Sequence, residues 1–370
     1  MRVSSVVALS LLIAAPVAAQ GWLAIPGERV ERTSEHYPET NERSHGIFYR
    51  VVAGRGGGYL GVGSIQSYSI AAAQGAERIV LVDYDPVVTR LHRSLRVLLA
   101  TCRDPACLRA RLAPDAEDQS ALAIAEALGD GWENTRTVRA FRVHRPLLAR
   151  QIDELGRVES WVSRPDWYGH IHELAARDRI IAHTADLTGS ISMRAIGRVA
   201  HDEGLVFRVI YLSNAEEYFS YGEDFAQNLA GLPRDEGTIV LRTLRDRRLP
   251  RTPGDSMWHY DVQPLDDLLR RLRDHGYRDS TWIVSDLVAS DSAHRADGSS
   301  VLDASTPALA RAGNRRWWLE SARSEPPAQH PRATDRRPPI SESASPGSRV
   351  RESFRARPRL PARSLRATPP

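Results

Sequence analysis

The feature that most constrains the fold of this chain is a repeated alternation of short apolar runs with longer amphipathic stretches. The apolar runs, each bounded by glycine or polar residues, predict strands at 59–63, 78–83, 179–186, 204–212, 237–242 and 280–286. The stretches between them predict helices at 64–75, 86–99, 189–203, 225–232 and 264–275. Strands that are apolar throughout are typical of a parallel sheet buried on both faces. The pattern therefore predicts an α/β fold, with a Rossmann-like, mostly parallel sheet and helices on both faces.

Residues 100–177 interrupt this alternation and predict a helical insertion after the second strand, with amphipathic segments at 122–128 and 147–155. The chain's two cysteines, Cys102 and Cys107, lie in this region with Asp104-Pro105 as a turn between them. A local disulfide is the first expectation in an oxidising compartment, and free thiols are the second. Metal binding comes last, because a structural zinc ion requires four ligands.

The N-terminus has the composition of a signal peptide. Arg2 precedes an apolar stretch that ends in Ala15-Pro-Val-Ala-Ala-Gln20, and we expect cleavage after Ala19. The expected organisation is a signal peptide at 1–19, a Rossmann-like domain at 20–310 and a tail at 311–370. The mature chain is then periplasmic or extracellular, and it meets the membrane only transiently, through its leader.

The C-terminal tail differs in composition from the body. Residues 321–370 hold 11 arginines, 10 prolines and 4 acidic residues. Their net charge is +7, so a total of +4 leaves the first 320 residues at −3. A solvated, disordered extension is the main interpretation. A basic patch for nucleic acid or membranes is the alternative, and a shifted reading frame is a third. We do not expect a nucleic-acid partner for the body.

A glycine pair followed by an acid is the strongest chemical motif. Gly61-Val62-Gly63 ends the first predicted strand, where glycine lets the backbone approach a ligand closely. Asp83 ends the next strand 20 residues after Gly63, a spacing that suits hydrogen bonds to ribose hydroxyls. Ser64-Ile65-Gln66 stands where dinucleotide-binding proteins carry a third glycine. The motif thus predicts a small nucleoside-type ligand without a pyrophosphate.

With these residues in place, the span from Tyr59 to Asp286 resembles the class I S-adenosylmethionine-dependent methyltransferases. It also resembles an uncharacterised bacterial family of methyltransferase-like proteins, through Gly61 to Gln66, Ser213 to Tyr218, and Asn228 to Pro233 with Arg242. The resemblance implies S-adenosylmethionine as the cofactor. The cofactor-binding residues that it implies are Gly61, Gly63, Gln66, Asp83, Asp186, Ser213 and Asn214. Glu216 and Tyr218, after the fourth strand, are the expected acid–base groups.

Two functions from different classes remain open. The first is an exported methyltransferase-like protein that transfers a methyl group to an unknown acceptor. The second is a non-catalytic exported binding or scaffold protein on a degenerate Rossmann fold. Tyr59 favours the second, because methyltransferases carry an acid two positions before the first glycine.

Other chemistries receive less support from the sequence. All 50 basic residues are arginines, which excludes a Schiff-base lysine. His170 and His172 are two positions apart and do not share a helix face, so a polar surface segment is preferred to a metal pair.

Overall fold

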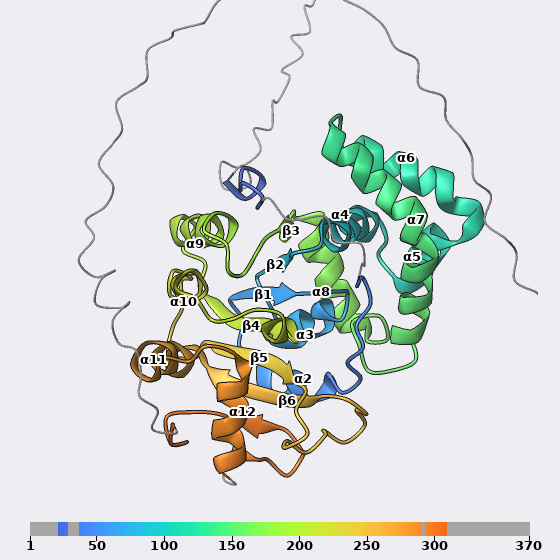
Figure 1. Ribbon diagram of the computed structural model, residues 1–370. Coiled ribbons are helices and arrows are strands. Elements are labelled where there is room, and N and C mark those ends of the chain that lie inside the picture. The colour runs from blue at the N-terminus through green and yellow to red at the C-terminus, as the bar shows by residue number, and fades with distance from the viewer. Residues whose placement is uncertain (1–20, 29–36, 291–292, 309–370) are drawn as a thin grey trace, which may run out of the picture. The chain divides into compact units, whose positions relative to one another are not determined.

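The computed structural model describes residues 21–28, 37–290 and 293–308. The predicted leader and tail lie outside the described residues. The strands among them form one seven-stranded sheet in the order β3-β2-β1-β4-β5-β6-β7 (Figure 1). These strands are β1 (Gly58–Val62), β2 (Arg78–Asp83), β3 (Ile180–Thr184), β4 (Phe207–Ser213), β5 (Ile239–Leu244), β6 (His259–Pro264) and β7 (Ser300–Val301).

Neighbouring strands from β3 to β5 pair in parallel, whereas β6 is antiparallel to β5 and β7 pairs in parallel with β6. The order of the first five strands is that of a doubly wound sheet. The direction of winding reverses between β1 and β4, and open α/β sheets bind ligands beyond the carboxyl ends of the strands at such a point.

The helices cover both faces of this sheet. They are α2 (Gly46–Val52), α3 (Ser67–Gln74), α4 (Pro86–Thr101), α5 (Pro105–Leu112), α6 (Glu117–Leu128), α7 (Trp132–Leu155), α8 (Pro165–Ala176), α9 (Ser192–Asp202), α10 (Glu223–Ala230), α11 (Leu265–His275) and α12 (Ser280–Ala289). Helices α2 to α8 contribute to one buried cluster and α9 to α12 to the other. Figure 1 shows the two groups on opposite sides of β1 and β4.

Successive strand residues divide between the two cores. Tyr59 and Ile79 pack into the first core, whereas Leu60 and Val80 pack into the second. A strand buried on both faces has to be apolar at every position, which is the pattern read in the sequence. The predicted α/β class, with its mostly parallel sheet and helices on both faces, is confirmed.

The turn from β2 into α4 fixes the position of Asp83. The Asp85 carboxylate accepts a hydrogen bond from the Val87 amide at 2.8 Å, and Pro86 occupies the first turn of the helix. This is a favourable helix start, because the cap satisfies a free amide and proline needs none. Asp83 is therefore held at the end of its strand, immediately before a well-defined helix.

The predicted strand at 280–286 is wrong, because these residues form α12. The Asp279 side chain accepts a hydrogen bond from the Thr281 amide at 2.9 Å and caps the helix. Ile283 and Leu287 are four residues apart and are both buried, as one helix face requires. The β-branched residues of this segment misled the prediction.

The sixth strand is instead β6, which alternates polar and apolar residues and is buried throughout its first five positions. Its polar residues are satisfied inside the protein. Asp261 accepts hydrogen bonds from Arg242 at 2.9 Å and from Ser300 at 2.6 Å, and Gln263 accepts one from Arg242 at 2.7 Å. Arg242 and Ser300 are distant in sequence from β6, so the alternation of polar and apolar residues in β6 could not by itself predict a buried strand.

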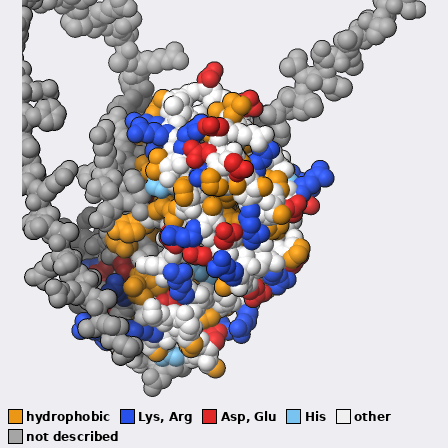
Figure 2. Space-filling view, turned by 90° about the vertical axis from the view of Figure 1, so that its right-hand side faces the viewer, with side chains coloured by type: hydrophobic (Ala, Val, Ile, Leu, Met, Phe, Trp, Pro, Cys, Tyr) orange, Lys and Arg blue, Asp and Glu red, His pale blue; other side chains and the backbone are white. Residues whose placement is uncertain are grey.

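The predicted helical insertion is confirmed as α5 to α8, between β2 and β3 (Figure 1). Cys102, at the end of α4, and Cys107, in α5, form a disulfide. His170 and His172 of α8 bond main-chain carbonyl oxygens, of Ala76 at 2.9 Å and of Leu99 at 2.7 Å. Figure 2 shows positive and negative side chains interspersed on the side that carries this region.

Residues 21–28 belong to the folded body. Trp22 is fully buried in the second core, and Arg78 stacks on its ring with the guanidinium carbon 5.0 Å from the centroid. The Glu28 carboxylate accepts hydrogen bonds from the amides of Ile191 and Ser192, at the start of α9. Within the described part of the chain, no helix is both long and apolar enough to cross a membrane.

Candidate functional site

The parallel register gathers three predicted ligand residues at one edge of the sheet. Val62 of β1 is level with Val82 of β2, and Asp83 is level with Thr184 of β3. Gly63, Asp83 and Asp186 therefore follow the carboxyl ends of three adjacent strands. Gly63 has a φ of +91°, a conformation that favours glycine.

Asp83 is the titratable group at the centre of this edge. Burial is the largest influence and raises the pKa of its carboxyl to about 7. Hydrogen bonds from the Asp85 and Gly63 amides oppose this rise, and the first reaches Oδ1 at 2.8 Å. A carboxyl that titrates near neutral pH at a strand end is typical of a functional site.

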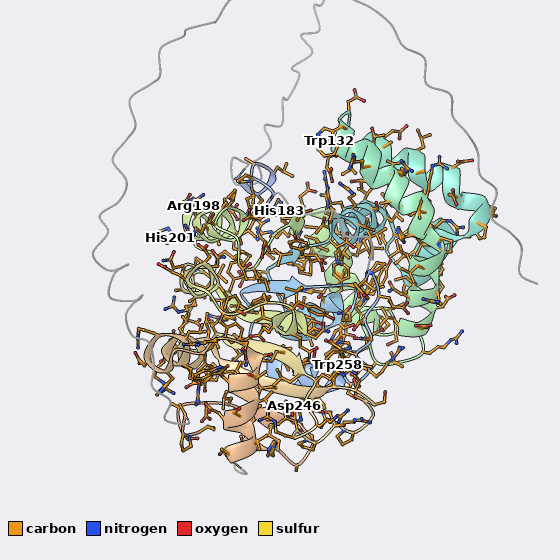
Figure 3. All side chains as sticks on the ribbon, viewed as in Figure 1. Trp132, His183, Arg198, His201, Asp246 and Trp258 are labelled. Atoms are coloured by element: carbon orange, nitrogen blue, oxygen red, sulfur yellow. A yellow bond between two sulfur atoms is a disulfide. The ribbon has the colours of Figure 1, made fainter. Side chains whose placement is uncertain are left out.

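Asp186 lies at the end of β3, beside the N-terminal segment. Its Oδ1 accepts hydrogen bonds from the Thr188 amide at 2.8 Å and from the Thr188 hydroxyl at 2.7 Å. Glu28 lies against the same loop, since both Glu28 and Asp186 would contact a Cβ atom added at Gly189. Residues 21–28 thus border the Asp186 end of the site. His183, one of the side chains marked in Figure 3, precedes this loop on β3, and burial lowers its pKa to about 4.

Gly61 serves the packing of Tyr59. A Cβ atom at position 61 would lie 2.5 to 2.8 Å from the ring and hydroxyl of Tyr59, which is fully buried. Glycine is therefore required here for the ring to lie along the strand, and this contact accounts for Gly61 without a ligand.

Gln66 and Ser64, which follow the glycine turn, bond each other. The Ser64 hydroxyl donates to Gln66 Oε1 at 2.5 Å, and both side chains are buried. Gln66 also lies close enough to the Tyr211 hydroxyl of β4 to lower the pKa of that group. Gln66 thus lies on the β4 side of the turn, whereas Asp83 lies on the β2 side.

Ser213 ends β4 in an unusual conformation and contacts a carboxylate that sequence analysis missed. Its φ is +53°, and the register of β4 against β5 shifts between Tyr211 and Ser213. A serine at positive φ is uncommon and strained by about 1 kcal/mol. The Ser213 hydroxyl donates to Glu42 Oε1 at 2.6 Å and also lies 3.4 Å from the side-chain oxygen of Asn214.

Glu42 is the centre of a buried polar network. Its Oε1 accepts hydrogen bonds from the Ser213 and Thr243 hydroxyls, each at 2.6 Å. Its Oε2 is 2.7 Å from His45 Nε2 and accepts a hydrogen bond from the Tyr211 hydroxyl. Burial opposes the charge, but the hydrogen bond and charge of His45 together with the hydroxyl donors outweigh it, and the pKa of Glu42 is lowered.

Neither Glu42 nor His45 carries a signal that a single sequence could reveal. Both belong to a polar stretch before α2, and their hydroxyl partners are 166 to 201 residues away. Only the fold shows that this stretch covers the carboxyl ends of β4 and β5.

Glu216 is held in a structural ion pair. Its Oε2 is 2.6 Å from Arg242 Nε, its Oε1 accepts a hydrogen bond from Tyr221 at 2.8 Å, and both charged side chains are buried. Burial disfavours the charge of Arg242, but Glu216 and Asp261 outweigh it and raise the pKa of Arg242. These partners give Glu216 a structural place in the fold, and its expected acid–base role stays a prediction. Tyr218, in contrast, is 77% exposed on the surface.

A pocket of about 440 Å³ opens beside Ser64 and Gln66. One wall is the 39–50 segment, which includes Glu42 and His45, and the other is formed by the end of α7 and residues 158–159. Its volume is within the range of small-molecule sites. It lies on the β4 side of the glycine turn, next to the point where the winding of the sheet reverses.

Fold and site together define a Rossmann-like α/β protein with polar groups at the carboxyl ends of its parallel strands. The chain belongs to the family described as Domain of unknown function (DUF7790), whose model matches residues 37–303. No curated protein matches it. Among solved structures, the rRNA methyltransferase aviRa from Streptomyces viridochromogenes is 15% identical, with a TM-score of 0.31, over 60% of this chain and 81% of that one.

Proposed function

We propose that this chain is an exported methyltransferase-like protein that binds S-adenosylmethionine or a related nucleoside at the carboxyl ends of β1, β2 and β3. The observation that carries the proposal is the position of Asp83 at the carboxyl end of β2 beside Gly63, where its ionised carboxylate can accept hydrogen bonds from ribose hydroxyls. Asp186, which follows β3, would contact the nucleobase of the ligand. The disulfide between Cys102 and Cys107 supports an oxidising compartment.

The residues present fit the nucleoside part of such a ligand. The hydrogen bonds described above engage Oδ1 of Asp83 and Oδ1 of Asp186, and a carboxylate has further acceptor positions. S-adenosylmethionine, when bound, would supply an activated methyl group. Gly61 is less suited to contact S-adenosylmethionine, because the Tyr59 ring occupies the side of β1 where a side chain of residue 61 would lie.

A second candidate, binding without methyl transfer, is favoured by the carboxylates on the β4 side. Glu216 is bonded to Arg242 and Tyr221, and Glu42 has four donors. A general base needs a free lone pair near its substrate. Glu42 offers none, and Glu216 is neutralised by the buried Arg242 cation, which supports a ligand-binding protein on this frame.

The first prediction concerns Asp83. Replacing Asp83 with Asn is expected to weaken the binding of S-adenosylmethionine and S-adenosylhomocysteine by about tenfold or more, because charge-assisted hydrogen bonds to the ribose are lost. Isothermal titration of the chain from Gln20 onward measures this. Asp202→Asn, the same change at an exposed position on α9, is the matched control.

The pH dependence of binding provides an independent readout. A ligand that requires ionised Asp83 should bind about tenfold more tightly at pH 8 than at pH 6, since the ionised fraction rises through a pKa of about 7. The variant should lose this dependence. Absence of saturable binding by the wild-type chain would overturn the nucleoside proposal, whereas binding without methyl transfer to any acceptor would select the second candidate.

Export is tested on the complete chain with its native leader. Expression in a Gram-negative host is expected to yield a periplasmic protein whose intact mass corresponds to a start at Gln20. The control variant is Ala19→Arg, which should block cleavage because the cleavage site requires a small residue at this position. A cytoplasmic protein that retains Met1 would contradict export.

A further inference from the structure

The polar residues at the floor of the pocket beside Ser64 and Gln66 have hydrogen-bond partners within the protein. The floor includes Glu42, whose donors were described above, and the Ser64–Gln66 pair. A satisfied polar floor does not need a polar ligand group to neutralise it. Tyr49, Ile65 and Leu155 add apolar surface to the walls, so the pocket can take an apolar group.

Three of the four acidic residues that line the pocket have arginine partners beyond its lining, whereas Glu42 pairs with His45. Glu39 and Glu154 pair with Arg150, and Glu159 pairs with Arg164 at 3.1 Å. Their charges are therefore partly compensated by the protein itself, since Glu39 and Glu154 share one arginine.

The two arginines that line the pocket, unlike these acidic residues, have no ion-pair partner among the described residues. Arg43 and Arg50 are exposed, and within the described ranges neither guanidinium has an ion pair or a hydrogen bond to another residue. Arg50 acts only through its charge, on Asp297. The Arg43 main chain is fixed, because its amide donates to Asp255 Oδ2 at 2.8 Å. Arg43 and Arg50 are thus the two cations of the lining that the described residues leave unpaired.

Gln151 adds an acceptor at the opposite wall. Its side chain is buried, with a relative exposure of 5%, and its Nε2 donates to the Pro38 carbonyl at 3.0 Å. That bond fixes which end of the amide is oxygen. Oε1 has no hydrogen-bond partner among the described residues, which is costly for a buried acceptor and leaves it suited to a donor from a ligand.

We propose that this pocket binds a small organic carboxylate with an apolar body and an amine donor, which is the chemistry of an apolar α-amino acid. Its carboxylate would meet Arg43 and Arg50, its amine would meet Gln151, and its side chain would lie against Tyr49, Ile65 and Leu155. Arginine is suited to this role, because its planar guanidinium matches a carboxylate. The site is separate from Asp83 and does not depend on the proposed nucleoside function.

The test is isothermal titration of the mature full-length chain with leucine, methionine and phenylalanine. Each amino acid is compared with its carboxamide, which lacks the negative charge, and with its deaminated acid, which lacks the amine. At least one amino acid is expected to saturate the protein below about 1 mM, and both analogues should bind about tenfold more weakly.

The arginines are tested by the double variant Arg43→Ala with Arg50→Ala, which should weaken binding by about tenfold or more. Its control is Arg198→Ala with Arg247→Ala, two exposed arginines elsewhere; Figure 3 marks Arg198 on α9. Unchanged thermal unfolding of both variants shows that they fold.

Three results would overturn the proposal. They are no saturation by any of the three amino acids at about 10 mM, equal binding of acid and carboxamide, and full affinity in the Arg43 and Arg50 variant. The Asp83→Asn chain should bind the amino acid normally, so failure of the nucleoside site and failure of this pocket are distinguishable.

Discussion

Replacing Arg242 with methionine is expected to lower the free energy of unfolding by about 3 to 5 kcal/mol, the typical cost of removing one partner from a buried charge network. Arg242 is fully buried and bonds Glu216 at 2.6 Å, Asp261 at 2.9 Å and Gln263 at 2.7 Å. Without it, two carboxylates remain in the interior with no cation between them. Their repulsion and desolvation account for the size of the effect.

Urea unfolding at pH 7, followed by tryptophan fluorescence, measures this cost. Arg234→Met is the matched control, because Arg234 pairs with the exposed Asp266 at 2.9 Å and should contribute less than about 1 kcal/mol. A loss of less than about 1 kcal/mol in the Arg242 variant would show that the network is not a stabilising unit. Raising the pH should not restore stability, because it supplies no cation to the two carboxylates.

The second large effect is expected at Glu42. Its replacement by Gln should cost about 2 to 4 kcal/mol at pH 7, because an amide has one acceptor oxygen and its NH₂ group would face hydroxyl donors. The carboxylate now accepts from Ser213, Thr243 and Tyr211 as well as pairing with His45. The same change should also weaken the hydrogen bonds that hold the floor of the pocket in place.

The sign of the pH dependence follows from the lowered pKa of Glu42. A carboxyl whose pKa is lower in the folded state stabilises the protein above its unfolded value, about 4.5, and this contribution is lost as pH falls through the folded value. The difference between wild type and variant should therefore narrow in acid. Glu39→Gln, at the partly exposed pair with Arg150, is the control. A difference that grows on acidification would contradict this account.

The parallel part of the sheet could be predicted because its signal is local. Strands β1, β2 and β4 are apolar on both faces, and each is followed by a turn or cap that the sequence displays, such as Asp85-Pro86 before α4. Segment β6 could not be found in this way. His259, Asp261 and Gln263 look like surface residues, and their burial depends in part on Arg242 and Ser300, which are distant in sequence.

The candidate site shows the same division. Gly63, Asp83 and Asp186 follow strands that the sequence predicts, so their proximity follows from parallel pairing. The ion pair of Glu216 with Arg242 could not be inferred, because Arg242 lies on β5, distant in sequence from Glu216. Glu42 and His45 were missed because no periodic pattern connects the stretch before α2 to the ends of β4 and β5.

The contact between Tyr59 and Gly61 bears on how such chains are recognised. Any larger residue at position 61 would collide with the aromatic ring beside it. Purifying selection for packing alone would then preserve a glycine at this position, even in a lineage that had stopped using a nucleoside. Gly61 therefore reports on the packing of β1 and gives no information about a ligand. In related chains, Gly63 and Asp83 are the better indicators of nucleoside binding.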